Sequence, residues 1–301
     1  MLPALAILAA ALCFSTTGTA QALASVDASP LAVGAARIVV GGGILGLLAL
    51  AQRSPARVRS GSRASTSALI AVGAIGVLAY QPLFFLGTRE NGVAIGTVVA
   101  LGSAPIATGI VDAVRLRRAP SPRWMLATAI ALLGVVLVSG VTGGATALAP
   151  TGLLASAGAG MSYALYTVCG KALIERGWTS TRVMGAVFGV AAVASLPVLL
   201  LAGTSWLLTP NGLALALWLG VVTTAIAYLL FGWGLARLSA VTVSTLTLAE
   251  PLAATVLGLF VLREQLTLVS GIGLALIAVG LAVVSAPSRR TEEVPDATTR
   301  A

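Results

Sequence analysis

Apolar runs follow one another along almost the whole chain, and short polar breaks separate them. Each run holds about 20 residues, the length that an α-helix needs to cross a hydrocarbon core of roughly 30 Å. The pattern therefore predicts an all-α membrane protein with ten transmembrane helices. The predicted spans lie near residues 2–24, 31–51, 67–87, 92–112, 124–141, 150–172, 183–203, 211–236, 239–261 and 267–285.

Composition agrees with a membrane protein, since 58% of the residues are hydrophobic and only 9% are charged. Soluble domains carry about 25% charged residues, and so few charges would not coat a globule of this size. The first span has a second interpretation, because the apolar start and the stretch at 19–24 (TAQALA) resemble a signal peptide. That segment lacks a Lys/Arg region before its apolar core, and its removal would leave nine helices.

The basic residues predict the orientation of the chain. Cytoplasmic connections are rich in Lys and Arg. With both termini cytoplasmic, the inside connections and the tail hold 15 of the 18 basic residues, the outside connections hold Arg89 and Arg263, and Arg37 lies within a span. The net charge of +9 is thus explained by topology, and no nucleic-acid partner is expected. We expect a multi-pass protein of the inner or plasma membrane.

The chain also contains an internal repeat. Residues 105–139 align without a gap to residues 251–285, so that Pro105 falls on Pro251 and Gly134 on Gly280. Five helices per half is an odd number, which predicts that the halves enter the membrane in opposite senses, with the substrate site near the midplane between them. The predicted repeats cover 1–145 and 146–286, and a disordered cytoplasmic tail covers 287–301. Small-residue spacings such as Gly42 to Gly46 and Gly185 to Gly189 predict close helix packing.

Several motifs in the second half carry a family resemblance. They are the stretch from Gly220 to Tyr228, the Ala249-Glu250-Pro251 run with Leu262–Leu266 after it, and the Gly271–Gly280 run, together with Arg37 in the first half. With these motifs the chain resembles the drug/metabolite transporter superfamily, specifically its EamA-type transporters. The resemblance implies ten helices in two inverted halves and secondary transport, often export, of amino acids, small metabolites or drugs.

The chain departs from that family pattern at a few positions. The first half has Ala104 and Arg118 where the second has Glu250 and Glu264, and the first helix has Phe14 and Ser15 where tryptophan and glycine are common in the family. Ala104 against Glu250 marks the position at which the two halves stopped being equivalent.

Glu250 is the acidic residue deepest within a predicted span. A charge at the centre of a membrane helix costs about 2.5–3.5 kcal/mol on insertion scales, so the side chain should face a cavity or a partner. Two interpretations stay open: a carboxylate that carries a proton or binds a substrate amine, and a protonated acid that only packs. The adjacent Pro251 can kink the helix, and Pro251 and its repeat partner Pro105 are gating candidates.

Arg37 is the basic residue set well within a span. It can bind a substrate carboxylate or pair with Glu250, or it can simply snorkel outward or cap carbonyl groups of a neighbouring helix. Other candidates for lining a cavity are polar or aromatic residues placed inside spans, since tyrosine hydroxyls need partners that lipid does not offer. These candidates are Thr17, Tyr80, Gln81, Phe84, Tyr163, Tyr166, Thr224, Tyr228 and Trp233.

The sequence offers little for enzyme chemistry. It contains no histidine, its two cysteines lie in apolar helices, and Gly170-Lys171 lacks the upstream glycine of a phosphate-binding loop. No metal site and no cofactor are expected. The leading hypothesis is a secondary transporter whose partners are a small-molecule substrate and the lipid bilayer, with proton coupling as one interpretation and monomer or homodimer both open. A sensor or scaffold, or an integral membrane enzyme, is the alternative; a solute-sized, polar-lined central cavity would favour the transporter.

Overall fold

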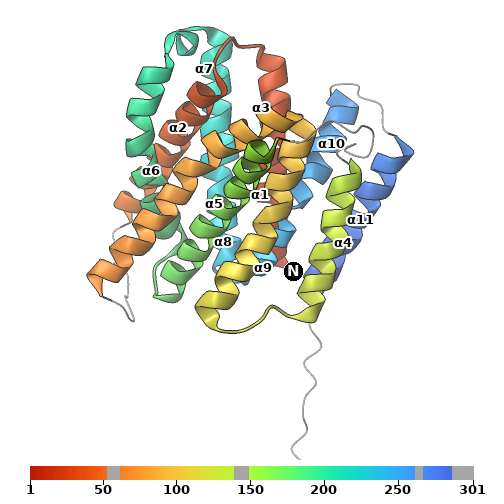
Figure 1. The fold of residues 1–301 in the computed structure, drawn as a ribbon. Coiled ribbons are helices and arrows are strands. Elements are labelled where there is room, and N and C mark those ends of the chain that lie inside the picture. The colour runs from red at the N-terminus through yellow and green to blue at the C-terminus, as the bar shows by residue number, and fades with distance from the viewer. Residues whose placement is uncertain (53–61, 139–148, 262–266, 287–301) are drawn as a thin grey trace, which may run out of the picture.

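The computed structural model describes residues 1–52, 62–138, 149–261 and 267–286. Within these ranges the chain is helical and contains no strand, and the helices form one bundle (Figure 1). The predicted tail at 287–301 and the outer-loop residues Arg263 and Glu264 lie outside the described ranges. Helices α1 (Leu2–Ala24), α2 (Pro30–Ala51), α3 (Arg63–Leu116) and α4 (Pro122–Val138) make up the first half.

The second half is divided into more pieces. It consists of α5 (Pro150–Glu175), α6 (Ser180–Ala202), the short turn η2 (Ser205–Leu208), α7 (Pro210–Leu217), η3 (Trp218–Ile226), α8 (Ala227–Leu235), α9 (Ala240–Leu246), α10 (Ala249–Val261) and α11 (Leu268–Ser285). Within the described part of the chain, eight helical stretches are long and apolar enough to cross a membrane, and α4 is apolar but shorter. As far as the described residues reach, the ten predicted spans fall on helical segments, while a count of ten crossings stays a prediction.

The backbone differs from the predicted spans in three places. The stretches near 67–87 and 92–112 join into α3, which is interrupted only at Gly92, where φ is 81°. Residues with positive φ are mostly glycine, so this one residue turns the chain where a loop was expected. The eighth span contains a π-helix, η3, and the ninth is broken between Leu246 and Ala249, just before Pro251. These departures from regular α-helix concentrate in the second half.

The last helices of the two halves pack against each other in a reciprocal way. A Cβ atom on Gly134 of α4 would lie 2.7 Å from the backbone nitrogen of Ile277, close to Gly273 of α11. A Cβ atom on Gly280, the repeat partner of Gly134, would lie 2.7 Å from the carbonyl oxygen of Ala127. Position 134 thus faces 273, while 280 faces 127, so α4 and α11 run antiparallel. Such a self-complementary contact indicates a two-fold relation between the halves.

The second helices of the halves, α2 and α6, pack in the same antiparallel sense. Gly42 lies against the backbone of Phe188, and a Cβ atom on Gly46 would lie 3.3 Å from the Cα atom of Gly189. The predicted close packing through these glycines is therefore confirmed. Because two repeat-related helix pairs are antiparallel, the two-fold axis lies across the helices, which is the geometry of an inverted repeat.

The two halves are interlocked. The most extensive helix contacts, α3 with α5, α2 with α6 and α4 with α11, all join one half to the other. The contacts between the two halves therefore form the interior of the bundle.

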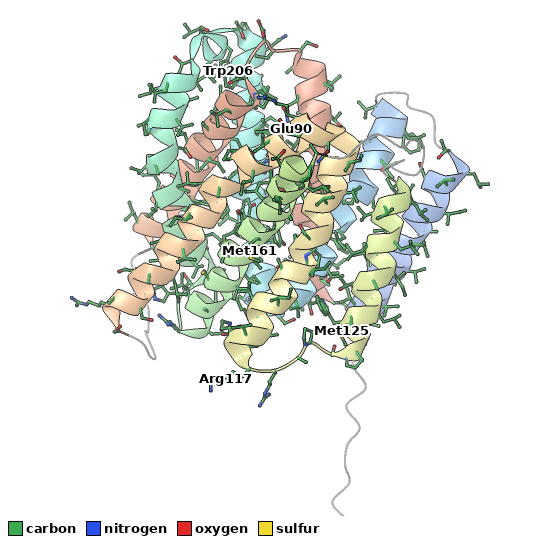
Figure 2. All side chains as sticks on the ribbon, viewed as in Figure 1. Glu90, Arg117, Met125, Met161 and Trp206 are labelled. Atoms are coloured by element: carbon green, nitrogen blue, oxygen red, sulfur yellow. The ribbon has the colours of Figure 1, made fainter. Side chains whose placement is uncertain are left out.

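The ends of the bundle differ in charge. Glu90 and Trp206 lie at one end, whereas Arg117 lies at the opposite end (Figure 2). We call the end with Arg117 the basic end, and it also holds the ends of α2, α5 and α8. There Arg182 donates to Gln52, which follows α2, and Arg176 donates to Ser65. Lys171 of α5 donates to Leu235 at the end of α8. Trp206 is only 6% exposed. It packs into a satellite core that also contains Ala32, Val33 and Ala36 of α2.

Candidate functional site

A cavity of about 70 Å³ lies in the middle of the bundle, between the two halves. It receives side chains from α1, α2, both parts of α3, α5, α6, α8 and α10. The repeat partners Leu101 and Thr247 both line it, and so do the partners Ala104 and Glu250. The full lining is Phe14, Arg37, Ile38, Val77, Tyr80, Gln81, Ala100, Leu101, Ala104, Tyr163, Tyr166, Phe188, Tyr228, Thr247, Leu248 and Glu250.

The break before α10 brings Glu250 to this cavity. Pro251 has no N–H group, so the helix cannot continue regularly through it. The chain instead closes tight turns, in which the amide of Leu248 donates to the carbonyl of Thr245 (3.0 Å) and the amide of Glu250 donates to that of Thr247 (2.9 Å). Glu250 is half-buried, and in the described part of the chain its carboxylate makes no hydrogen bond or ion pair. The cavity therefore contains an acidic group with free hydrogen-bonding capacity.

Arg37 reaches the cavity from α2 and is held by the eighth predicted span. Its Nε donates to the hydroxyl of Thr224 (3.0 Å) and its Nη2 donates to the carbonyl of Thr223 (3.0 Å). The π-helix η3 makes this possible, because its wider turn lets the Thr224 hydroxyl donate to Leu219 five residues back (2.9 Å). Arg37 thus both caps a neighbouring helix and lines the cavity, which combines two of its predicted roles.

Aromatic side chains form one wall. The hydroxyls of Tyr166 and Tyr228 are 3.1 Å apart, and those of Tyr163 and Thr247 are 3.0 Å apart. The ring of Phe188 lies 4.0 Å from that of Tyr228 between centroids. Because each of these three tyrosine hydroxyls has a partner in the wall, this side of the cavity is arranged to keep its shape.

The part of the lining that comes from α3 is less constrained. Tyr80 and Gln81 line the cavity, and within the described residues neither side chain makes a hydrogen bond. Tyr80 is supported from behind by Phe84, whose ring stacks at 5.9 Å between centroids. Together with Glu250, these two residues offer polar groups that a solute or water can engage.

The structure brings most predicted site residues together and leaves some outside. Arg37, Tyr80, Gln81, Tyr163, Tyr166, Tyr228 and Glu250 line the cavity. Phe84 and Thr224 support lining residues, and Pro105 and Pro251 directly follow the lining residues Ala104 and Glu250.

Two candidates lie elsewhere. Trp233 stacks with the guanidinium of Arg237, 3.8 Å from its ring centroid, towards the basic end. Thr17 lies on α1 outside the lining, and its hydroxyl is buried with no partner among the described residues.

Sequence reasoning missed the apolar part of the lining. Phe14 and Phe188 face the cavity with Val77 and Leu248, and no signal separates such residues from their neighbours in an apolar helix. Ala104 was noticed through the repeat, as the partner of Glu250. The alignment of repeats was thus the signal that located a lining residue without polar chemistry.

The size of the cavity restricts what this conformation can hold. A water molecule takes up about 30 Å³ of liquid, so a volume of about 70 Å³ accommodates a few waters. Drug-sized ligands occupy pockets of roughly 300–1,000 Å³. The bundle is therefore neither solid at its centre nor open enough for a typical solute. No cluster of three potential metal-binding side chains occurs among the described residues.

Comparisons with known proteins agree with this two-repeat architecture. The model of the EamA-like transporter family matches residues 1–140 and again residues 150–286. The protein YwfM of Bacillus subtilis (strain 168), described as an uncharacterized transporter, is 39% identical over 284 residues, which are 94% of this chain and 94% of that protein. YdeK of the same organism, with the same description, is 29% identical over 288 residues, or 91% of each chain.

A solved crystal structure has a similar fold. It superimposes with a TM-score of 0.76 at 23% identity, covering 94% of this chain and 96% of that one. Its identity is low enough that the likeness concerns the fold alone. The apolar helices and the relatives make this a multi-pass membrane protein. The chain, matched twice by one family model and along nearly its full length by YwfM, belongs to the EamA-like transporter family.

Proposed function

We propose that this protein is a secondary transporter that moves a small organic solute across the cell membrane by alternating access, in the direction of export. The observation that carries the proposal is the unpaired carboxylate of Glu250 in a central cavity shared by both halves. An acidic side chain inside a membrane protein is costly when no hydrogen bond or ion pair compensates its charge, and such residues commonly mark solute or ion pathways.

The inverted repeat supplies a physical route for alternating access. When two halves are related by an axis in the membrane plane, exchanging their conformations turns a cavity open on one side into one open on the other. The small cavity corresponds, on this proposal, to a nearly closed state between those two. Solute binding then requires the helices around the cavity to separate at one end.

The cavity chemistry suits a solute with an amine, a carboxylate or both. Glu250 binds the amine or carries a proton, and Arg37, with donors left free by its bonds to Thr223 and Thr224, faces a carboxylate. Tyr80 and Gln81 add neutral hydrogen-bonding groups. Amino acids, small metabolites and drugs with these groups are the proposed substrates.

The charged residues support an orientation with both termini in the cytoplasm. Of the basic side chains in the described ranges, Arg89 belongs to the end that carries Glu90, and nearly all the others gather at the basic end. Cytoplasmic ends of membrane helices are enriched in Lys and Arg, so the basic end is proposed to be cytoplasmic.

One observation favours a second function. A cavity of about 70 Å³ also fits a sensor or scaffold whose centre holds only water. Such a protein would show no solute flux in any direction.

The test is transport by purified protein in proteoliposomes with an imposed pH gradient. A panel of radiolabelled amino acids and amines serves as solutes, and Glu250→Gln is compared with the wild type and with Glu90→Gln, a matched change at the surface. We expect Glu250→Gln to remain folded by size-exclusion chromatography and to lose the dependence of flux on the pH gradient. Unchanged flux with unchanged pH dependence would refute the role of Glu250, and absence of flux for the whole panel would favour the sensor or scaffold.

A further inference from the structure

A network of charged side chains ties α3 to α5 at the basic end. The Nη1 atom of Arg115 donates to Oε2 of Glu175 over 2.7 Å. The Nε and Nη2 atoms of the same guanidinium donate to Oδ1 of Asp112, over 3.1 Å and 3.0 Å. Asp112 is almost fully buried, so its charge depends on Arg115 for compensation. One arginine therefore links the end of α3 to the end of α5.

The end of α5 is fastened to two further places. Lys171 donates to the carbonyl of Leu235 at the end of α8 (3.0 Å), and Arg176 donates to the hydroxyl of Ser65 at the start of α3 (2.8 Å). These bonds and the Arg115 network surround the same helix terminus. Opening the bundle at the basic end between α3 and α5 would have to break the bonds of Arg115 to Glu175 and of Arg176 to Ser65.

This region lies between the cavity and the basic end. Along α5, Tyr166 lines the cavity, Cys169 follows about 4.5 Å further along the helix axis, and Glu175 lies about 9 Å beyond that. Cys169 is 7% exposed and faces Gly73 of α3, whose Cβ atom, if present, would lie 3.6 Å from that of Cys169. Gly73 lies on the first part of α3, whereas Asp112 and Arg115 lie near the end of its second part. A path from the cavity along α5 to the basic end therefore passes Cys169 before it reaches Glu175 and the network.

Among the described residues, the second repeat has no equivalent of this network. Residues 105–139 align with 251–285, so the positions equivalent to Asp112 and Arg115 are Gly258 and Val261. Neither can form an ion pair. The two ends of the transport path, which the inverted repeat would otherwise make alike, thus differ in this charged contact.

We propose that Asp112, Arg115 and Glu175 form a charge-locked gate at the basic end, and that this gate biases the resting protein towards closure on that side. The proposal rests on the alternating access proposed above and assigns its energetic bias to named residues. Opening the gate separates Arg115 from Glu175, whereas opening the opposite end costs no ion pair at Gly258 and Val261. A difference of this kind shifts the population of the two states, because a state that loses a charged contact becomes rarer.

The test uses Cys169 as a native reporter. In a Cys13→Ala background, inside-out vesicles are treated with a membrane-impermeant methanethiosulfonate reagent, and the rate of labelling is measured. Glu175→Gln removes one charge from a side chain that is 44% exposed, which keeps the risk of misfolding low. We expect it to raise the labelling rate of Cys169 roughly twofold to fivefold, the range for losing one partly exposed ion pair. Glu175→Asp should stay near the wild type, and Glu90→Gln, at the opposite end, should have no effect.

A second reporter separates gating from general loosening. Ala104→Cys, in a background with Cys13→Ala and Cys169→Ala, places a thiol in the cavity and is labelled from the opposite face on right-side-out vesicles. With Glu175→Gln its labelling should fall, because the two states exchange population. Increased labelling from both faces, or unchanged labelling of Cys169, would overturn the gate. The labelling needs no solute, so a shift of accessibility without measurable flux would uphold the gate while refuting transport.

Discussion

Neighbouring glycines on α2 allow a direct test of the packing that frames the cavity. Gly42 faces α6, where an added Cβ atom would collide with the carbonyl oxygen of Phe188 and lie 3.1 Å from its carbonyl carbon. Gly43 is one residue further along, and an added Cβ atom there meets nothing within 4 Å. Gly46 is intermediate, with the Cα atom of Gly189 at 3.3 Å from such an atom. Replacing each of these glycines by alanine therefore tests three different distances between an added Cβ atom and its nearest neighbour, all on one helix.

The expected magnitudes follow from these distances. Replacing glycine by alanine inside a helix stabilises it by about 0.5–1 kcal/mol, and Gly43→Ala should show this gain alone. Gly42→Ala has the same gain but forces apart two backbones, at a cost of about 1–3 kcal/mol for overpacking. At roughly 2–4 °C per kcal/mol, the midpoints of Gly42→Ala and Gly43→Ala should differ by roughly 2–12 °C, with Gly46→Ala between them.

The measurement is the thermal unfolding midpoint of the purified protein in one detergent, followed by size-exclusion chromatography after heating. Gly42→Ala should also lower any transport activity, since it pushes on Phe188, whose ring lines the cavity. Equal midpoints for Gly42→Ala and Gly43→Ala would refute the close packing of α2 on α6, and a lower midpoint for Gly43→Ala would reverse the reasoning.

Two hydrogen-bond predictions use the same unfolding assay. Thr224→Val removes the acceptor of Arg37 Nε and should cost about 1.5–3 kcal/mol, whereas Thr223→Val keeps the carbonyl that Arg37 uses and should cost about 0.5–1.5 kcal/mol; equal losses would contradict this role of Thr224. Trp124→Phe removes two indole bonds of 2.8 Å to α9 and should lower stability by about 1–3 kcal/mol. Trp178→Phe is its control, because the N–H of Trp178 has no partner in the described structure, and a loss as large as that of Trp124→Phe would argue against the bonds to α9.

The positions of the helices were readable from the sequence because the bilayer selects directly for apolar length. The inverted arrangement was also predictable, since it followed from the repeat and from the asymmetry of the arginines. The irregular backbone was predictable only in part. Pro251 predicted a kink in the ninth span, but the single turn at Gly92 and the π-helix η3 were not predicted, since many other glycines and apolar stretches of this chain stay in regular helix.

The polar part of the site was predictable for a related reason. A tyrosine or glutamate in the middle of an apolar helix finds no partner in lipid, so residues such as Tyr163, Tyr166 and Glu250 turn to the interior. Trp233 was misplaced because an indole near a helix end is equally well satisfied by a nearby arginine. Phe14 and Phe188 carried no signal, since apolar residues suit lipid, core and cavity alike.

The positions at which the two repeats carry different residues indicate which helices differ in function between the halves. Matched residues in an inverted repeat give the two opposite-facing states equal contacts, so they do not favour a direction. Three of the mismatches are Ala104 against Glu250, Asp112 against Gly258 and Arg115 against Val261. All three fall on one pair of equivalent segments, the second part of α3 and α10. The first mismatch puts charge in the cavity and the other two put it at the basic end, so this helix pair connects the chemistry of the cavity with the bias between states.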